Sequence, residues 1–343
     1  FNYDKLIIRN DRIGDNIILL PFILGSDTKE NIYYISDYLN NIINDLKINT
    51  HWQALDKKNN KKDLLVLNLA GEKSKNINYN FKNNILTISQ LKITLNFDYG
   101  LPILFTPNYA SNLSQSEFTN NGLKFLKIDS NPIKGIERLN KIIPNSNLLK
   151  KNQKFILILG LGLDDGRKIN ENQLKRISFL LKENELETYI LSEPDFKIKI
   201  HNISKKYNIK IIDSRKLTDL FYIFKNSKLV IGYDCGPMHI ASLLTQTITL
   251  NSHTSLNQWC KHIWHKKIKK HTFNSFDKKI YLEEMLNLGS NKKNWILYEN
   301  TNRCPIHSDK RFLKLTPRDK CCDINLLYLE KIILKVLDSE NSK

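Results

Sequence analysis

The chain contains two kinds of hydrophobic pattern: short apolar runs rich in β-branched residues, and longer amphipathic stretches. The chain opens with an apolar run at residues 5–9, a polar turn that contains Gly14, and an apolar helical stretch over residues 16–24. This order of strand, turn and helix is typical of the first unit of a doubly wound sheet. Further candidates follow, which are strands at 32–35, 63–69 and 101–105 and helices at 37–46 and 134–143.

The pattern starts again after residues 145–153, a polar stretch without periodicity that is the best linker candidate. The elements expected beyond it are strands at 155–159, 188–191, 209–213, 228–232 and 247–251 and helices at 172–183 and 217–226. Strands that alternate with helices predict parallel sheets, and the restart predicts two of them. We therefore expect an α/β protein with two Rossmann-like domains, residues 1–150 and 151–343, whose parallel sheets face a cleft.

The C-terminal part of the chain has a different pattern. Residues 292–320 are polar and are expected to be irregular, whereas residues 326–337 predict an amphipathic helix that packs back across the domains. The longest apolar runs, at 17–24 and 155–163, are shorter than the roughly 20 residues of a membrane-spanning helix. No signal peptide is visible, and a cytoplasmic, water-soluble protein is expected.

The charge balance changes this picture by indicating an anionic partner. The sequence has 53 basic and 35 acidic residues, a surplus of 18 positive charges, with dense basic runs at 57–62 and 261–270. A solvated basic surface and attraction to an anionic membrane or glycolipid are both compatible with this surplus. Nucleic acid is disfavoured because neither run has the aromatic interleaving of a nucleic-acid module.

The turn after the first strand carries the first candidate chemistry. Gly14 permits a tight turn there, and the next helix presents its amide groups to a ligand. Asp15 is then either a general base for an attacking hydroxyl or a cap of the following helix. Arg9 and Arg12 either hold phosphate or pair with neighbouring carboxylates.

A second candidate segment follows the strand at 228–232. Gly236 lets the backbone approach a ligand closely, and Pro237 suits the first turn of a helix, whose exposed amides favour a diphosphate. Asp234 repels phosphate and is better suited to sugar hydroxyls. His239 either donates to a phosphate oxygen or is a buried helix histidine bonded to a carbonyl.

A third loop follows the strand at 155–159 and contains Lys168 just before a helix. This lysine either neutralises the charge of a leaving diphosphate or lies on the solvated surface. No loop contains a complete Gly-x-Gly-x-x-Gly run after a strand, so a nicotinamide dehydrogenase is disfavoured.

Together these loops resemble the heptosyltransferase family of bacterial lipopolysaccharide synthesis, glycosyltransferase family 9. The segment from Leu6-Ile7-Ile8-Arg9 to Arg12-Ile13-Gly14-Asp15, followed by Pro21, is similar to the opening motif of the family. Residues 217–236 with His239-Ile240-Ala241 are similar to its closing motif, in which a strand ends in Asp-Thr/Ser-Gly and a histidine follows. The resemblance covers both halves of the chain.

The resemblance implies GT-B architecture and inverting, metal-independent transfer from a nucleotide-diphosphate sugar, typically ADP-heptose. It implies that Asp15 deprotonates the acceptor hydroxyl, that Lys168 steadies the donor phosphates and that Asp234 binds the donor sugar. The remaining donor residues expected on this basis are Cys235, Gly236, Pro237, Met238 and His239, with Glu193 and Asp195 as candidates for a ribose hydroxyl. Arg9, Arg12 and Gly14 would lie on the acceptor side.

The chain departs from the family pattern at three places. Cys235 replaces the usual threonine or serine, and a thiol is a weaker hydrogen-bond donor than a hydroxyl. The family's Lys-Trp-Pro is Lys168-Ile169-Asn170 here, and its His-Pro-Gly lead-in is Leu159-Gly160-Leu161-Gly162. These differences concern the donor more than the fold.

The cysteines give a weak metal hypothesis. Cys304 and His307, followed by Cys321 and Cys322, have some metal-ligand character, and ordinary thiols are the alternative. Family members that glycosylate autotransporter proteins resemble this region and hold iron through cysteines. Their upstream Cys-x-x-Cys pair is missing here, so no cofactor is expected.

The leading hypothesis is therefore transfer of heptose to a lipopolysaccharide-core acceptor of the lipid A–Kdo type, with peripheral contact to the inner face of an anionic inner membrane. One alternative is a protein O-heptosyltransferase of the autotransporter-modifying type. Another is a protein that keeps the fold and binds sugar nucleotides without turnover.

Overall fold

The computed structural model describes residues 4–9, 13–55, 64–69, 86–89, 93–94, 114–143, 154–160, 169–214, 216–251, 260–274, 279–299 and 326–341. The chain forms two compact units. Unit 1 comprises Phe1–Ile143 and Asn257–Trp264, and unit 2 comprises Pro144–Leu256 and His265–Lys343. The return of the short segment Asn257–Trp264 to unit 1 was not expected from the sequence. Its Trp264 ring packs edge-on against Phe22 at a centroid distance of 6.2 Å.

Unit 1 is built on a six-stranded sheet of order β3-β2-β1-β4-β5-β6 among its described residues. Its strands are β1 (Asp4–Ile8), β2 (Ile32–Ile35), β3 (Trp52–Ala54), β4 (Leu64–Asn68), β5 (Leu86–Ser89) and β6 (Ile93–Thr94). All neighbours pair in parallel except β5 and β6, which are antiparallel. The strands predicted at 32–35 and 63–69 are confirmed; the one predicted at 101–105 lies outside the described residues.

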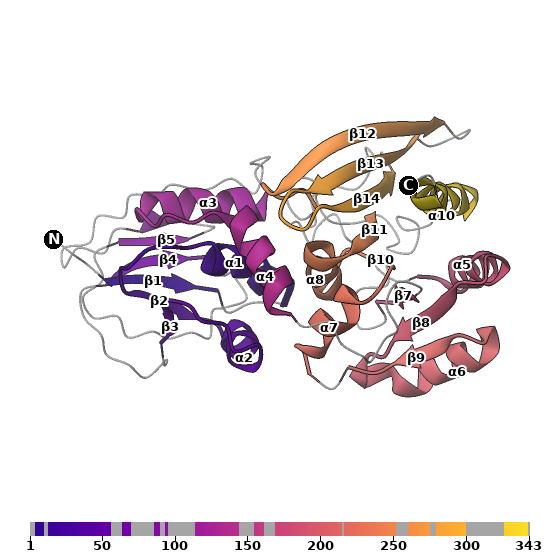
Figure 1. The fold of residues 1–343 in the computed structure, drawn as a ribbon, viewed down its shortest axis with the longest axis horizontal. Helices are drawn as coiled ribbons and strands as arrows, with labels where there is room; N and C mark the ends of the chain where they lie inside the picture. Colours follow the sequence, from indigo (N-terminus) through magenta and orange to yellow (C-terminus); the bar gives the residue numbers. More distant parts are fainter. Residues whose placement is uncertain are drawn as a thin grey trace. The chain divides into compact units, whose positions relative to one another are not determined.

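The helices of unit 1 are α1 (Ile13–Leu24), α2 (Asp37–Asp45), α3 (Gln115–Phe125) and α4 (Pro132–Ile142). Helix α1 is apolar from Ile17 onward, and every residue from Gly14 to Leu24 is buried. Helices α1 and α4 lie side by side (Figure 1) because Gly135 lets the backbones touch. A Cβ atom on Gly135 would lie 1.8 Å from the carbonyl oxygen of Pro21.

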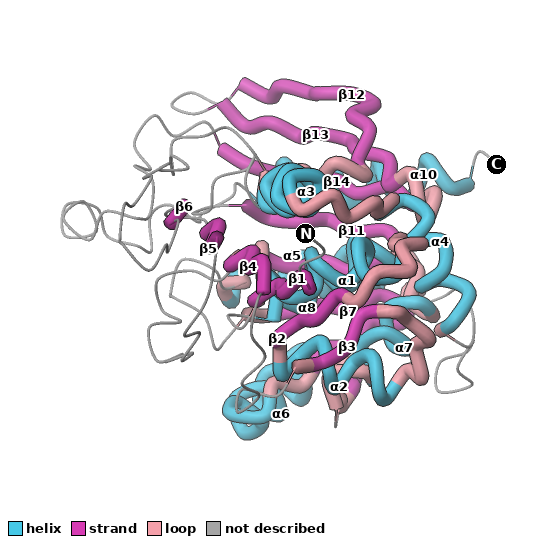
Figure 2. Tube along the Cα trace, turned by 90° about the vertical axis from the view of Figure 1, so that its left-hand side faces the viewer, coloured by secondary structure: helices cyan, strands magenta, loops and turns pink. Residues whose placement is uncertain are grey.

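Unit 2 contains an eight-stranded sheet of order β12-β13-β14-β11-β10-β7-β8-β9 in its described part. Its strands are β7 (Lys154–Ile158), β8 (Glu187–Leu191), β9 (Lys210–Ile212), β10 (Leu229–Tyr233), β11 (Gln246–Asn251), β12 (His265–Asn274), β13 (Lys279–Asn287) and β14 (Lys292–Glu299). The strands from β14 to β9 are parallel, which confirms the predicted parallel sheet. Strands β12 and β13 extend the sheet as an antiparallel edge beside β14, and Figure 2 shows them as neighbouring strands.

Strand β14 contradicts the expectation that residues 292–320 are irregular. Trp295, Ile296 and Leu297 are buried at its centre, and the lysines at its start obscure this short apolar run in the sequence. The helices of unit 2 are α5 (Glu171–Glu183), α6 (Lys197–Tyr207), α7 (Asp219–Lys225), α8 (Gly236–Leu244) and α10 (Leu326–Asn341), with a 3₁₀ turn η3 (Pro194–Phe196). Among the described helices, none is long and apolar enough to span a bilayer.

Helices α8 and α10 cover opposite faces of the antiparallel edge. The core that contains Trp295 and Leu282 also contains Ile333 of α10. Asn287 and Asn294 point the other way, where their side-chain amides donate to the carbonyl oxygen of Ser242 in α8 at 2.9 and 3.3 Å. Side chains alternate along a strand, so residues of β13, β14 and the part of β12 from Lys269 onward can be assigned to the α8 face or the α10 face.

Candidate active site

Arg9, directly after β1, holds the carboxylate of Asp15 in the first turn of α1. The Arg9 side chain is 1% exposed, and its Nη2 donates to Asp15 Oδ1 at 3.1 Å. Its Nε donates to the Asp15 carbonyl oxygen at 3.1 Å, and its Nη1 to the Leu69 carbonyl oxygen at 2.9 Å. Nη2 also lies 3.3 Å from Gln115 Oε1 at the start of α3. The Arg9 guanidinium therefore binds Asp15 of α1, and its contacts with Leu69 after β4 and Gln115 of α3 hold the guanidinium in place at the carboxyl end of β1.

The start of α1 bears on one of the two interpretations of Asp15. Helix α1 begins at Ile13, three residues earlier than the sequence predicts, so Asp15 lies inside the first turn and not at the cap. Asp15 is therefore not the N-cap residue of α1, and its assignment as the general base stays a prediction. Of the two interpretations of Arg9, the structure shows pairing with Asp15. Gly14 is buried beside it, and Arg12 lies outside the described residues.

Gln115 contacts Arg9 in the candidate site, although the sequence pattern did not single it out. It lies 106 positions from Arg9, and only the fold brings the two together. A local signal existed, because Ser114 and Glu117 form a reciprocal capping box that begins α3. That signal predicts where the helix starts but not what its first residue contacts.

In unit 2, the segment after β10 places Asp234 and His239 next to each other. Asp234 Oδ1 lies 3.5 Å from His239 Nε2, and the two side chains are 8% and 10% exposed. The backbone N–H of Asp234 donates to the carbonyl oxygen of Leu250, which holds the segment against β11. His239 thus faces a carboxylate through Nε2, an arrangement that neither interpretation of this histidine anticipated.

Helix α8 begins with Gly236 and Pro237, preceded by Cys235 at the N-cap position. The first amides of a helix have no acceptor within the helix, so Gly236 and Met238 present N–H groups at this end. The Cys235 side chain makes no capping hydrogen bond to them. The Met238 side chain is 2% exposed and packs under the segment, where a Cβ atom on Gly232 would lie 3.0 Å from its Sδ. Met238 is therefore available to a ligand through its amide and not through its side chain.

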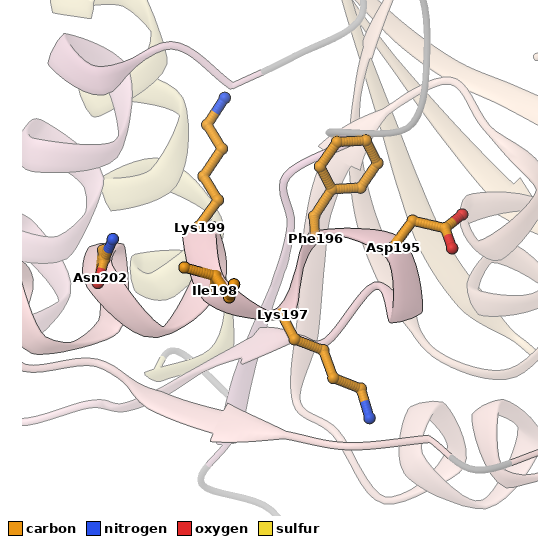
Figure 3. Close-up of a pocket in the computed structure, with 6 residues that line it drawn as sticks. All are labelled: Asp195, Phe196, Lys197, Ile198, Lys199 and Asn202. Carbon is orange, nitrogen blue, oxygen red and sulfur yellow. The ribbon is translucent and has the colours of Figure 1, made fainter.

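The two acidic candidates after β8 have different surroundings. Glu193 is half-buried and precedes η3, whereas Asp195 belongs to an open hollow of about 470 Å³. The hollow is lined by Asp195, Phe196, Lys197, Ile198, Lys199 and Asn202. In Figure 3, Lys197 and Lys199 point in opposite directions and the Asp195 carboxylate points away from Asn202. The polar groups of this hollow do not converge on one point.

Lys168 lies outside the described residues. The four proposed metal ligands also lie outside them, namely Cys304, His307, Cys321 and Cys322. Within the described ranges, no three histidine, cysteine or acidic side chains gather as a metal site would require. The described cysteines Cys235 and Cys260 are both buried.

No protein-family model matches the sequence, and no curated protein sequence matches it either. Solved structures do match. The E. coli heptosyltransferase WaaC with ADP aligns at 10% identity over 97% of this chain and 99% of its own, with a TM-score of 0.61. A family 9 glycosyl transferase from Veillonella parvula aligns at 14% identity over 75% of this chain and 83% of its own, with a TM-score of 0.54.

A third structure, the iron-containing dodecameric glycosyltransferase TibC from enterotoxigenic E. coli, aligns at 10% identity over 98% of this chain and 76% of its own, with a TM-score of 0.50. At such identities the likeness concerns the fold. The predicted fold class is confirmed by these alignments and by the two α/β units. The chain therefore has the fold of the heptosyltransferases of glycosyltransferase family 9, the family that its two strand-end motifs resemble.

Proposed function

We propose that the protein is a glycosyltransferase of family 9 that transfers heptose from ADP-heptose to a hydroxyl of a lipopolysaccharide-core acceptor. The observation that carries the proposal is the Asp15 carboxylate, which a buried arginine holds at the carboxyl end of a central strand. Ligands of open α/β sheets bind at this end of the strands. The fold shared with WaaC, whose structure holds ADP, supports a nucleotide-sugar donor.

In the proposed reaction Asp15 is the general base. Its carboxylate accepts the proton of the acceptor hydroxyl while the hydroxyl oxygen forms a bond to the anomeric carbon of the donor sugar. The bond between that carbon and the diphosphate oxygen breaks, and ADP leaves with the electron pair. Attack from the face opposite the diphosphate inverts the anomeric centre. Arg9 is a positioning residue, because its hydrogen bonds fix the carboxylate that receives the proton.

The donor is assigned to the segment after β10. The amides of Gly236 and Met238 would receive the diphosphate charge, aided by the partial positive charge of the α8 N-terminus and by Lys168. Asp234 would accept hydrogen bonds from sugar hydroxyls, with His239 beside it. Glu193, which follows β8 and precedes η3, is the proposed contact for the ribose. None of these roles requires a metal ion, so we expect turnover to persist in a chelator.

The acceptor is assigned by charge. A surplus of 18 positive charges attracts a phosphorylated glycolipid and an anionic membrane surface, to which the protein would bind peripherally. A protein acceptor is the alternative. Incubation of the enzyme with ADP-heptose and either a lipid A–Kdo glycolipid or an autotransporter fragment separates the two by which acceptor gains the mass of one heptose.

The central test is Asp15→Asn, which keeps the size of the side chain but removes its basicity. We expect the variant to keep the increase in melting temperature that ADP-heptose causes, while glycolipid turnover falls by about 10²-fold or more. Asp37→Asn controls for the loss of one negative charge, because Asp37 is an exposed acidic residue in the first turn of α2. Full turnover by Asp15→Asn would refute the assignment of the base. If ADP-heptose raised the melting temperature of none of the three proteins, the parent and the two variants, the proposed donor would be wrong.

A further inference from the structure

A second basic site lies on the α10 face of the antiparallel edge of unit 2. His271 of β12 pairs with Leu282, and Lys269 pairs with Glu284, so both belong to the face whose Leu282 packs in the α10 core. Lys293 belongs to this face because it lies two residues before Trp295 on β14. The Asp234–His239 segment belongs instead to α8, whose Ser242 contacts the opposite face.

The central contact joins two basic side chains. Lys335 Nζ of α10 lies 2.8 Å from His271 Nε2 and 3.5 Å from Nδ1. One of the two nitrogens must accept the hydrogen bond, so this contact requires that the imidazole or the lysine amine is neutral. The geometry therefore brings together two groups that would repel each other if both were protonated.

The surrounding charges are mostly of the same sign. Burial lowers the pKa of His271 from its ordinary value, and the positive charges of Lys335 and Lys269 lower it further, while Glu284 acts in the opposite direction. Partial burial of its otherwise exposed side chain also lowers the pKa of Lys335; Lys269 and Lys293 add to this effect and Glu284 opposes it. Glu284 itself is bound to Lys293 at 2.8 Å. The Glu284 carboxylate of β13 thus faces three lysines and a histidine, which come from β12, β14 and α10.

We propose that Lys269, His271, Lys293 and Lys335 form a binding site for a phosphate group, separate from the proposed active site. A phosphate oxygen placed between His271 and Lys335 would accept from both and would replace their mutual contact with two charge-assisted hydrogen bonds. Lys269 and Lys293 supply the further positive charge that a dianion requires. An exposed lysine-rich strand also protects a sheet edge from pairing, but that function needs no basic groups converging from α10.

The site predicts a change in the protonation of His271. A bound anion favours the protonated imidazole, so phosphate raises the pKa of His271 and binds more tightly as the pH falls through that value. The imidazole resonance is followed by NMR over pH in millimolar sodium phosphate and in sodium chloride of equal ionic strength. Its assignment comes from the signal that disappears in His271→Gln.

The variants are Lys269→Gln and Lys335→Gln, both at exposed positions. Each should weaken phosphate binding about tenfold. Lys335→Gln removes a charge-assisted hydrogen bond to the phosphate, and Lys269→Gln removes a neighbouring positive charge. Lys335→Gln should also raise the pKa of His271 in chloride alone, since it removes a neighbouring positive charge. Lys175→Gln on α5 is the control, because it makes the same charge change at an exposed helix position.

A second arm identifies the source of the phosphate group. The protein is sedimented with phosphatidylcholine vesicles with and without phosphatidic acid. A phosphate-dependent pKa shift without vesicle binding supports a soluble phosphate ligand. Vesicle binding that is lost in Lys269→Gln and Lys335→Gln but kept in Lys175→Gln supports a lipid phosphate. The proposal is overturned if His271 does not respond to phosphate and vesicle binding is independent of both lysines, or if Lys175→Gln is equally impaired.

Discussion

Replacement of Arg9 by methionine tests how strongly the fold depends on the Asp15 contact. The Arg9 side chain is 1% exposed and that of Asp15 is 10% exposed, so water cannot replace the lost cation. Removing one partner of a buried ion pair costs about 3–5 kcal/mol, because the other charge stays buried without compensation. We therefore expect Arg9→Met to lower the free energy of unfolding of unit 1 by about 3–5 kcal/mol.

The double variant distinguishes an unpaired charge from lost packing. Asp15→Asn removes the charge that Arg9→Met leaves behind, so the double variant should be more stable than Arg9→Met alone by about 1 kcal/mol or more. It should remain less stable than the parent protein, because the Leu69 carbonyl and the Gln115 amide oxygen lose the same donor. Simple additivity of the two destabilising effects would refute the buried-pair interpretation.

Tryptophan fluorescence during urea unfolding can follow unit 1 by itself. The four tryptophans are Trp52, Trp259, Trp264 and Trp295, and only Trp295 belongs to unit 2. In a Trp295→Phe background, the fluorescence change therefore reports unfolding of unit 1. The background protein must first show cooperative unfolding by circular dichroism.

An exposed pair in the same unit provides the control cycle. Arg138 Nη2 lies 2.7 Å from Asp27 Oδ1, shorter than the Arg9–Asp15 contact, but the side chains are 45% and 63% exposed. Arg138 lowers the pKa of Asp27 through its hydrogen bond and charge. Water screens such a pair, so the cycle of Arg138→Met and Asp27→Asn should show a much smaller coupling free energy. Equal coupling in the two cycles would mean that burial is not the cause.

Two further substitutions test the packing of unit 1 and the start of α8. Gly135→Ala places a Cβ atom 1.8 Å from a backbone oxygen and should destabilise unit 1 by about 1–3 kcal/mol or more. Gly122→Ala should cost less in the same fluorescence assay, because its Cβ atom meets only the flexible side chain of Leu67; equal losses would contradict the backbone contact. Cys235→Ser supplies an N-cap oxygen and should stabilise the protein by about 0.5–1 kcal/mol in thermal unfolding. If Cys235→Ala is equally stabilising, capping is not the reason.

The sequence predicts the alternating elements well where apolar runs are continuous. Such runs are buried on both faces of a parallel sheet, as in β1, β7 and β10, and they are visible without knowledge of their neighbours. Strand β12 has no such signal, because its lysines face solvent and Ile268 is 48% exposed at a register shift. It is a strand because β13 pairs with it. That pairing is a tertiary contact, which the hydrophobic pattern of β12 itself does not encode.

The same limit applies to the candidate site. A glycine and a carboxylate after a strand are local features, so Asp15 could be identified from the sequence. The place of Asp15 within α1 and its contact with Arg9 are set by packing, and the sequence pattern does not encode them. The other acceptors of Arg9 come from distant parts of the chain, and they are the Leu69 carbonyl oxygen after β4 and Gln115 Oε1 of α3.

The way Arg9 holds Asp15 constrains how the proposed base can act. Asp15 Oδ1 and the Asp15 carbonyl oxygen both accept hydrogen bonds from the rigid, planar guanidinium of Arg9. The bond to the carbonyl oxygen fixes the guanidinium relative to the backbone, so rotation of the carboxylate would break the bond to Oδ1. On the proposed mechanism Oδ2 is then the atom that receives the proton. A lysine at position 9 would keep the positive charge but lose this two-point hold, so Arg9→Lys should retain donor binding and lower kcat. An unchanged kcat in a folded Arg9→Lys variant would mean that charge, and not orientation, is what Asp15 requires from position 9.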